Sequence, residues 1–223
     1  MLFKEIEIPI ANESVKGDLT VFPKMKAVII FAHGSDSSRK SPRNQAVAQY
    51  LNENGFGTFL FDLLTTEEAK DRKNVFNIDL LADRLVVATR FLRKLPEVHE
   101  ETRFGYFGAS TGAGAAIKAA DLISVEEEIY AVVSRGGRPD LAGDSLNTLK
   151  TPTLLIVGGN DAGVIELNEL AEEKLSNCIL VIIPGATHLF IEPGTMEQVS
   201  KKALEWFEQQ LPEELYPFPE MSV

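Results

Sequence analysis

The chain has 223 residues, a length that fits a single α/β domain with a sizeable core, so we expect one domain over residues 1–223. Hydrophobic residues make up 44% of the sequence and charged residues 25%, which excludes a disordered or fibrous chain. The formal net charge of -11 opposes attraction to phosphate backbones and anionic lipid surfaces. Neither nucleic acid nor a membrane is therefore an expected partner.

Residues 1–8 lack the basic segment and apolar stretch of a signal peptide, and every apolar run is shorter than the ~18 residues of a membrane span. We therefore expect a cytoplasmic location. Cys178 is the single cysteine, which excludes an internal disulfide, and its place in an apolar run predicts a core thiol. A catalytic or metal-binding cysteine is the alternative, but no CxxC partner or nearby histidine supports it.

The predicted elements begin with a hairpin, because residues 3–8 and 15–22 alternate apolar and polar side chains, as at the edge of a sheet. Short continuous apolar runs follow, and they are typical of parallel strands covered on both faces. These runs lie at residues 27–32, 59–61, 104–107, 130–133, 153–157 and 178–183. The segments between them show helical periodicity, with Ile78, Leu81, Leu85, Ala88 and Leu92 on one face, and Val199, Ala203, Trp206 and Leu211 on another. This alternation predicts an open, mostly parallel, doubly wound sheet of about eight strands with an amino-terminal antiparallel hairpin.

Two segments fall outside this alternation. Residues 65–77 carry mixed charges and are too few for a cap domain, so we expect a solvated loop, with a place beside the pocket as the alternative. The segment from 212 to 223 contains prolines that cannot continue the last helix, so we expect a frayed or surface tail after a catalytic core at about 15–211.

The segment Gly108-Ala109-Ser110-Thr111-Gly112 lies between an apolar run and a helix-forming run of small residues at 113–120. A nucleophile elbow requires this context, because its sharp turn strains the serine and its glycines let neighbouring backbone pass close. An ordinary turn that matches by chance is the alternative. The motif predicts that Ser110 is a nucleophile.

Two further residues extend this pattern. Asp161 lies just beyond the predicted strand at 153–157, and His188 lies in the loop before the last predicted helix. For Asp161 the alternative is a helix N-cap, and for His188 a loop histidine that donates to backbone. Together with Ser110 they predict a catalytic triad.

The chemistry requires all three residue types. A serine hydroxyl is a poor nucleophile at neutral pH, so His188 would accept its proton, and Asp161 would hold the imidazole in the correct tautomer. The negative charge that develops on the substrate carbonyl oxygen needs donors, for which we name the backbone N–H groups of Ser35 and Thr111. We expect His33 to orient the loop that carries Ser35, with a catalytic base as the alternative.

Four segments together resemble the α/β-hydrolase superfamily: Ala32-His33-Gly34-Ser35, Gly108-Ala109-Ser110-Thr111-Gly112, Gly158-Gly159-Asn160-Asp161 and Thr187-His188-Leu189-Phe190. The chain order Ser, Asp, His is also that of the superfamily. The small size without a lid resembles its dienelactone-hydrolase-like branch, over roughly residues 15–211. The resemblance implies an α/β-hydrolase fold with no large cap domain, and hydrolysis of carboxylic esters, lactones or thioesters with no metal and no organic cofactor. Dienelactone hydrolases proper carry cysteine in the elbow where this chain has Ser110, which weakens dienelactone as the substrate.

Two arginines are candidates for substrate binding. Arg39 follows the predicted oxyanion loop, and Arg135 follows the predicted strand at 130–133. Ordinary loop arginines bond carbonyls or surface acids. The functional alternative is that Arg39 or Arg135 binds an anionic group of the substrate, because a guanidinium pairs with a carboxylate in bidentate fashion.

The sequence therefore predicts a serine hydrolase that cleaves small carboxylic esters or lactones through an acyl-enzyme on Ser110. Alternatives are a thioesterase or peptidase with the same triad, and a scaffold, natural or engineered, that keeps the fold without turnover. The expected partner is a small-molecule ester, lactone or thioester. The sequence indicates no oligomeric state.

Overall fold

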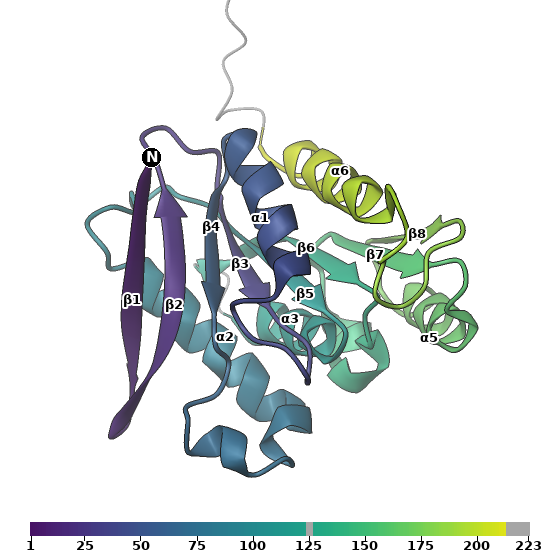
Figure 1. Ribbon diagram of the computed structural model, residues 1–223, viewed down its shortest axis with the longest axis horizontal. Helices are drawn as coiled ribbons and strands as arrows, with labels where there is room; N and C mark the ends of the chain where they lie inside the picture. Colours follow the sequence, from purple (N-terminus) through teal and green to yellow (C-terminus); the bar gives the residue numbers. More distant parts are fainter. Residues whose placement is uncertain (124–126, 213–223) are drawn as a thin grey trace, which may run out of the picture.

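The computed structural model describes residues 1–123 and 127–212, so residues 213–223 of the predicted tail lie outside the described residues. Its centre is an eight-stranded sheet in the order β1-β2-β4-β3-β5-β6-β7-β8 (Figure 1). The strands are β1 (Leu2–Ile10), β2 (Glu13–Val21), β3 (Val28–Ala32), β4 (Gly57–Phe61), β5 (Phe104–Ala109), β6 (Ile129–Arg135), β7 (Thr153–Gly158) and β8 (Cys178–Ile183). The chain winds outward from β3 in both directions, which confirms the predicted doubly wound sheet.

The antiparallel part of the sheet is the amino-terminal hairpin. β1 pairs with β2 from Leu2 opposite Val21 to Ile10 opposite Glu13, and β2 is antiparallel to β4. The remaining neighbours are parallel. Because parallel strands end at the same edge of a sheet, the loops after β3, β4, β5, β6, β7 and β8 meet along one edge.

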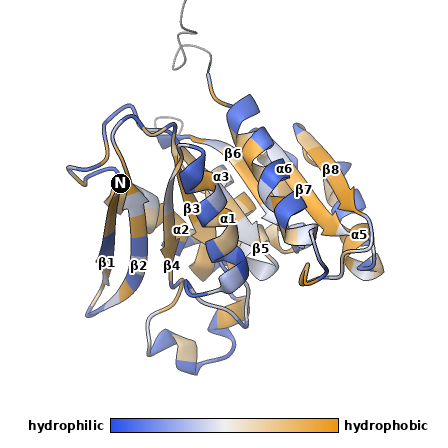
Figure 2. Cartoon of the chain, turned by 45° about the horizontal axis from the view of Figure 1, so that its top comes forward, coloured by the Kyte–Doolittle hydropathy of each residue, from blue (hydrophilic) through white to orange (hydrophobic). Residues whose placement is uncertain are grey.

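Helices cover both faces of the sheet, and the strands between them are largely hydrophobic (Figure 2). Helices α1 (Pro42–Glu53) and α6 (Thr195–Gln209) pack on one face; α2 (Ile78–Leu92), α3 (Thr111–Leu122), α4 (Ser145–Thr148) and α5 (Ala162–Glu172) pack on the other. The predicted apolar face of α2 is buried, as are Val199, Ala203 and Trp206 of α6. No helix in the described ranges is long and apolar enough to cross a membrane.

The sequence analysis names no residues or bounds for helix α1, because Asn44 interrupts its otherwise apolar buried face. Its start nevertheless carries a local signal. The Ser41 hydroxyl oxygen accepts a hydrogen bond from the Asn44 N–H at 3.4 Å, and Pro42 opens the first turn. This start lies directly after the loop that follows β3.

Residues 65–77 are more ordered than the predicted solvated loop. They form two 3₁₀ turns, at Glu68–Lys70 and Asn74–Phe76. The buried Arg84 of α2 donates to a Glu68 carboxylate oxygen at 2.6 Å and to the Leu63 carbonyl oxygen at 3.2 Å. A partly buried ion pair therefore fixes this segment to the domain.

The prediction of burial on both faces is wrong for β8, because β8 is an edge strand. Ile179 is 47% exposed and Ile182 is 38% exposed. On this edge the Leu180 N–H donates to a carboxylate oxygen of Glu172 at 2.8 Å. Cys178 is partly buried against the core, and desolvation raises its pKa to about 12, so its thiol stays protonated at neutral pH.

Candidate active site

Ser110 forms the turn between β5 and α3 with a backbone conformation of φ 52° and ψ -122°. A positive φ is unfavourable for any residue with a Cβ, so it persists only where the surroundings enforce it. Here the Ser110 N–H donates to the Arg135 carbonyl oxygen at 3.2 Å, and the Ser110 carbonyl oxygen accepts from the Arg138 N–H at 3.0 Å. Backbone bonds to the last residue of β6 and to the loop after it thus hold Ser110 in the strained turn.

The two glycines of the motif are required by close contacts between backbone segments. A Cβ on Gly108 would collide with the Ala113 Cα, and a Cβ on Gly112 would collide with the Ala32 carbonyl oxygen. Either collision would force the strand and helix apart. The small residues therefore let α3 start directly against β3 and β5.

Asp161 and His188 approach each other because their two loops are joined. The Asn160 N–H donates to the Ala186 carbonyl oxygen at 2.9 Å, and the Asn160 side-chain amide donates to the Gly185 carbonyl oxygen at 2.9 Å. The His188 Nδ1 lies 2.7 Å from an Asp161 carboxylate oxygen. Asp161 occupies the N-cap position of α5 but makes no capping bond with its side chain. Its carboxylate therefore orients His188 instead of capping the helix.

The loops that contain Gly34 and Gly136 lie close to Ser110 and His188, respectively. A Cβ built on Gly34 would lie 3.1 Å from the Ser110 Cβ, and a Cβ built on Gly136 would lie 3.6 Å from the His188 Cε1. Since the Ser110 N–H bonds the carbonyl oxygen of Arg135, the residue before Gly136, the serine and the imidazole flank one short segment. The side chains of Ser110 and His188 are both partly exposed.

The two nominated oxyanion donors belong to segments next to Ser110. Thr111 is the first residue of α3, and the first N–H groups of a helix have no acceptor within the helix. Ser35 follows Gly34, which contacts Ser110, and lies in the loop between β3 and α1. Both N–H groups are therefore placed near the serine.

His33 has both ring nitrogens engaged in fixing this loop. Its Nε2 accepts from the Leu63 N–H at 3.2 Å, so Nδ1 carries the proton and donates to the Gly34 carbonyl oxygen at 2.9 Å. Desolvation by burial lowers the pKa of His33, which favours this neutral form. The contacts match the expected orienting function and leave no free nitrogen for a catalytic base.

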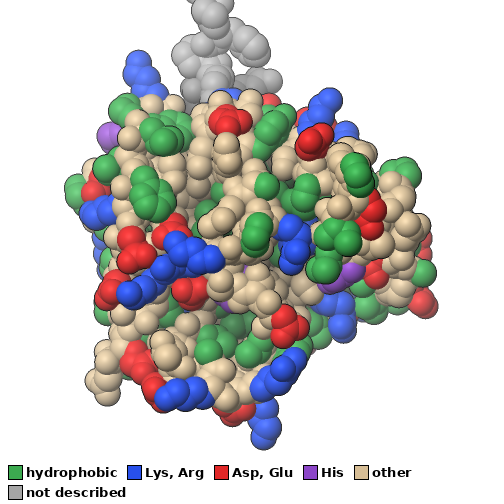
Figure 3. All heavy atoms as spheres, viewed as in Figure 1, with side chains coloured by type: hydrophobic (Ala, Val, Ile, Leu, Met, Phe, Trp, Pro, Cys, Tyr) green, Lys and Arg blue, Asp and Glu red, His purple; other side chains and the backbone are tan. Residues whose placement is uncertain are grey.

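Arg39 is surrounded by carboxylates. Its guanidinium lies 2.9 Å from Glu5, 3.5 Å from Asp18 and 3.5 Å from Asp62, and its side chain is 10% exposed. Its backbone N–H also donates to Asp62 at 3.0 Å. Figure 3 shows charged side chains of both signs side by side over β1 and β2. Because protein carboxylates already match its charge, the structure gives Arg39 a place in holding the loop after β3, and we do not propose it further as a substrate-binding residue.

Arg135 has no carboxylate partner among the described residues, although it is only 5% exposed. Its Nη2 lies 3.5 Å from the Asn44 side-chain oxygen, its guanidinium lies 5.7 Å from the centre of the Phe190 ring, and its Nε has no hydrogen-bond partner. Desolvation, and then repulsion by Arg43, lower its pKa to about 10. Arg135 therefore stays a candidate for binding an anionic group.

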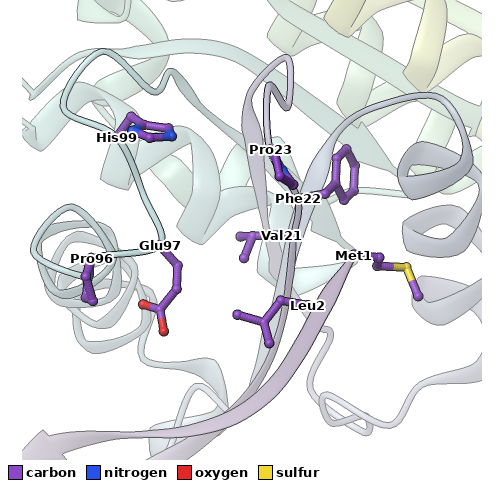
Figure 4. Close-up of a pocket in the computed structure, with 8 residues that line it drawn as sticks. All are labelled: Met1, Leu2, Val21, Phe22, Pro23, Pro96, Glu97 and His99. Atoms are coloured by element: carbon purple, nitrogen blue, oxygen red, sulfur yellow. The ribbon is translucent and has the colours of Figure 1, made fainter.

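A separate hollow of about 330 Å³ lies away from Ser110 (Figure 4). Met1, Leu2 and the end of β2 form one side, and Pro96, Glu97 and His99 form the other. Its lining contains no serine or cysteine, and Glu97 is already paired with Lys4 at 3.0 Å. The described ranges contain no group of three or more His, Cys, Asp or Glu that could hold a metal ion.

The sequence-based prediction missed two residues near the site, Asp62 and Asn44, and it took Arg43 for an ordinary loop arginine. Asp62 directly follows β4, and a charged residue at the carboxyl end of a predicted strand was a usable signal. Arg43 and Asn44 belong to the first turn of α1, and the Ser41-Pro42 pair could have predicted that helix start. Without bounds for α1, nothing in the sequence placed these side chains beside Arg135.

No family model matches the sequence. Among solved structures, the dienelactone hydrolase from Anabaena variabilis is 47% identical with a TM-score of 0.89, and the match covers 95% of this chain and 99% of that protein. Est1E from Butyrivibrio proteoclasticus shares the fold at 18% identity with a TM-score of 0.77, covering 92% and 98% of the two chains. The Pyrococcus furiosus esterase Pf2001 does so at 19% identity with a TM-score of 0.72, covering 95% and 92%.

Two Mycobacterium tuberculosis proteins that are provisionally named phosphoribosyl transferases are 53% identical to this chain over 205 residues. The match covers 92% of this chain but 46% of each relative, so the chain spans about half the length of the curated relatives it matches. The likeness to the Anabaena variabilis dienelactone hydrolase, in contrast, extends over nearly the whole of both chains. This chain belongs to the dienelactone-hydrolase-like branch of the α/β-hydrolase superfamily.

Proposed function

We propose that the chain is a serine hydrolase that cleaves small carboxylic esters or lactones through an acyl-enzyme on Ser110. Two observations together carry the proposal: the strained Ser110 turn bonds Arg135, and the His188 imidazole lies against the next residue, Gly136, with its Nδ1 2.7 Å from the Asp161 carboxylate. Strain at a residue with a free hydroxyl is typical of a functional position, because packing alone would favour glycine there.

In the first step the Ser110 Oγ attacks the substrate carbonyl carbon while the His188 Nε2 takes the hydroxyl proton. The bond between Nδ1 and Asp161 supports this direction of transfer, since a proton on Nδ1 leaves Nε2 free as the acceptor. The protonated imidazole then gives its proton to the leaving alcohol, and an acyl-enzyme remains on Ser110. Water repeats the sequence, with His188 as its base, and releases the acid.

Negative charge on the carbonyl oxygen is stabilised by the N–H groups of Thr111 and Ser35. The Thr111 N–H lies at the positive end of α3, where the helix dipole favours an anion. Loss of one such donor typically costs about 10²- to 10³-fold in kcat. The contacts of His33 and Arg39 support the loop that presents Ser35.

The name of the mycobacterial relatives raises phosphoribosyl transfer as a second candidate function. More than half of each relative lies outside the match, so the name can describe the other part of those proteins. The residues gathered around Ser110 favour hydrolysis for this chain. A thioesterase or peptidase with the same triad would differ from an esterase in the bond it cleaves, and a scaffold would show no turnover.

The test compares p-nitrophenyl acetate hydrolysis by the wild type, Ser110→Ala and Ser14→Ala. Ser14 is the control because its hydroxyl lies in the hairpin, where it donates to Glu7. Ser110→Ala should lose turnover with an unchanged fold by circular dichroism, and Ser14→Ala should keep it. A fluorophosphonate should label Ser110, as located by mass spectrometry. Turnover by purified Ser110→Ala would refute the proposal. A panel of short esters, lactones, thioesters and peptides would then identify the bond that is cleaved.

A further inference from the structure

An open polar hollow of about 460 Å³ lies beside the proposed oxyanion loop. It is lined by Ser35, Asp36, Ser37, Ser38, Lys40, Ser41, Pro42 and Arg43, which run from the nominated oxyanion donor into the first turn of α1. Serine hydroxyls, the positive end of a twelve-residue helix and a guanidinium are the groups that bind oxyanions in proteins. The first turn of α1 contains no acidic residue.

The guanidinium groups of Arg43 and Arg135, near the start of α1, have no carboxylate partner among the described residues. Neither Arg43 nor Arg135 forms an ion pair within residues 1–123 and 127–212, and the Nε of each is buried without a hydrogen-bond partner. Arg135 points its Nη2 at Asn44, in the first turn of α1. A buried cation is expected to be paired, so an unpaired one next to a hollow indicates space for an anion from solution.

The acidic side chains nearby do not supply this charge. Asp36 lines the hollow, but it is 81% exposed and lies 3.5 Å from Arg72. Asp18 is 10% exposed and is bound by Lys40 at 2.7 Å and by Arg39. Arg43 lines the hollow, and Arg135 contacts Asn44, the next residue of α1. Two positive charges without a carboxylate partner among the described residues therefore lie together at the start of α1, in a protein with a formal net charge of -11.

The charge of the ligand follows from the number of arginines. Arg43 is close enough to Arg135 to disfavour its charged form, and a single negative charge would leave one of the two guanidinium groups unmatched. We propose that this hollow binds a dianionic oxyanion carried by the substrate, with a phosphate monoester as the best-fitting class. The inference rests on the proposed ester hydrolysis at Ser110, and it adds a charge requirement to that site.

The first test uses three p-nitrophenyl esters with the same acyl chain, which ends in a phosphate ester, a carboxylate or a carboxamide. A second series carries the same three groups on the alcohol. In at least one series kcat/KM should be about 10- to 150-fold higher for the phosphate than for the carboxamide, the range of one charge-assisted contact. The carboxylate should lie between them. Equal values for all three, or a carboxylate better than the phosphate, would overturn the inference.

Variants identify the residues responsible. Arg43→Gln and Arg135→Gln should each remove most of the phosphate preference, measured as the ratio of kcat/KM for the phosphate ester to kcat/KM for the carboxamide. Arg90→Gln is the matched control, because Arg90, on α2, is half exposed and already forms an ion pair with Glu127. A preference that survives both Arg43→Gln and Arg135→Gln would place the anion elsewhere and refute the site.

A binding measurement separates this inference from the proposed function. The Ser110→Ala protein, titrated with inorganic phosphate by calorimetry, should show one saturable site that is absent from the Ser110→Ala/Arg43→Gln double variant. Phosphate binding without ester hydrolysis by the wild type would sustain the anion site and refute the hydrolase. Ester hydrolysis without charge preference and without phosphate binding would sustain the hydrolase and refute the anion site.

Discussion

The loop after β3 separates two regions that hold a buried arginine in opposite surroundings. On its β4 side the Arg39 guanidinium contacts three carboxylates, whereas on its α1 side Arg135 has none among the described residues. The two side chains are similarly buried, so exposure does not distinguish them. A buried arginine matched by protein carboxylates holds the surrounding loop in place, whereas a buried arginine without them is a candidate for binding an anion from solution.

The largest expected effect is a loss of kcat on replacing Asp62, one of the three carboxylates around Arg39. Asp62 accepts the Arg39 N–H and faces its guanidinium, so Asp62→Ala should loosen the loop that carries Ser35. Removal of an oxyanion donor lowers kcat by about 10²- to 10³-fold, and we expect the loss in this variant to approach that size. KM should change less than threefold. Asp62→Asn keeps an acceptor oxygen for the Arg39 N–H and should lose less. Steady-state kinetics within twofold of wild type for Asp62→Ala would show that Asp62 does not position the loop.

The next effect concerns stability on the same side. Arg39→Met leaves Glu5, Asp18 and Asp62 without their shared cation, and Asp18 is largely buried. We expect the free energy of unfolding to fall by about 3 kcal/mol, the lower end of the range for breaking a buried pair, because Glu5 is half exposed. Urea titration measures the change, and an unaltered midpoint would contradict it.

The same substitution on the other side should behave differently. Arg135→Met removes a buried charge that has no matching acid in the described chain, so we expect the free energy of unfolding to be unchanged or to rise by about 1 kcal/mol. The measurement is again urea unfolding, in buffer without phosphate or carboxylate. A loss comparable to that of Arg39→Met would show that the two arginines are equivalent and would erase the contrast.

The smallest effect is a pH dependence at His33. Burial lowers its pKa in the folded state, so the unfolded chain binds more protons as the pH falls below about 6.5, the value of a free histidine. Stability should therefore decrease on acidification through this range, with a slope of at most about 1.4 kcal/mol per pH unit. His33→Asn should flatten this part of the profile of unfolding free energy against pH. An identical slope in the variant would assign the dependence to other groups.

Much of the fold could be predicted because strand and helix patterns are local. The hairpin, the buried parallel strands and the face of α2 each follow from the spacing of apolar residues. Strand order is set by packing between distant segments, so the edge position of β8 and the exposure of Ile179 did not follow.

For the candidate site, too, local motifs could be predicted and contacts between distant segments could not. The motif around Ser110 and the positions of Asp161 and His188 after strands are visible in the sequence, and the structure brings Asp161 and His188 into contact. The partners of Arg39 come from β1, β2 and the end of β4, which are distant along the chain. No spacing rule distinguishes Arg39 from Arg135, and only the folded arrangement does.

The bond between Glu172 and the Leu180 N–H has a consequence for self-association. β8 reads Cys-Ile-Leu-Val-Ile-Ile, without a charged residue, and such an edge is a template for pairing with another strand. The Glu172 carboxylate occupies the Leu180 donor and places a negative charge beside exposed isoleucines, so an incoming strand would bury that charge against its own carbonyl groups. The Glu172 side chain of α5 thereby opposes pairing of β8 with a strand of another molecule. The strand can therefore consist of apolar residues, as its packing against the core requires.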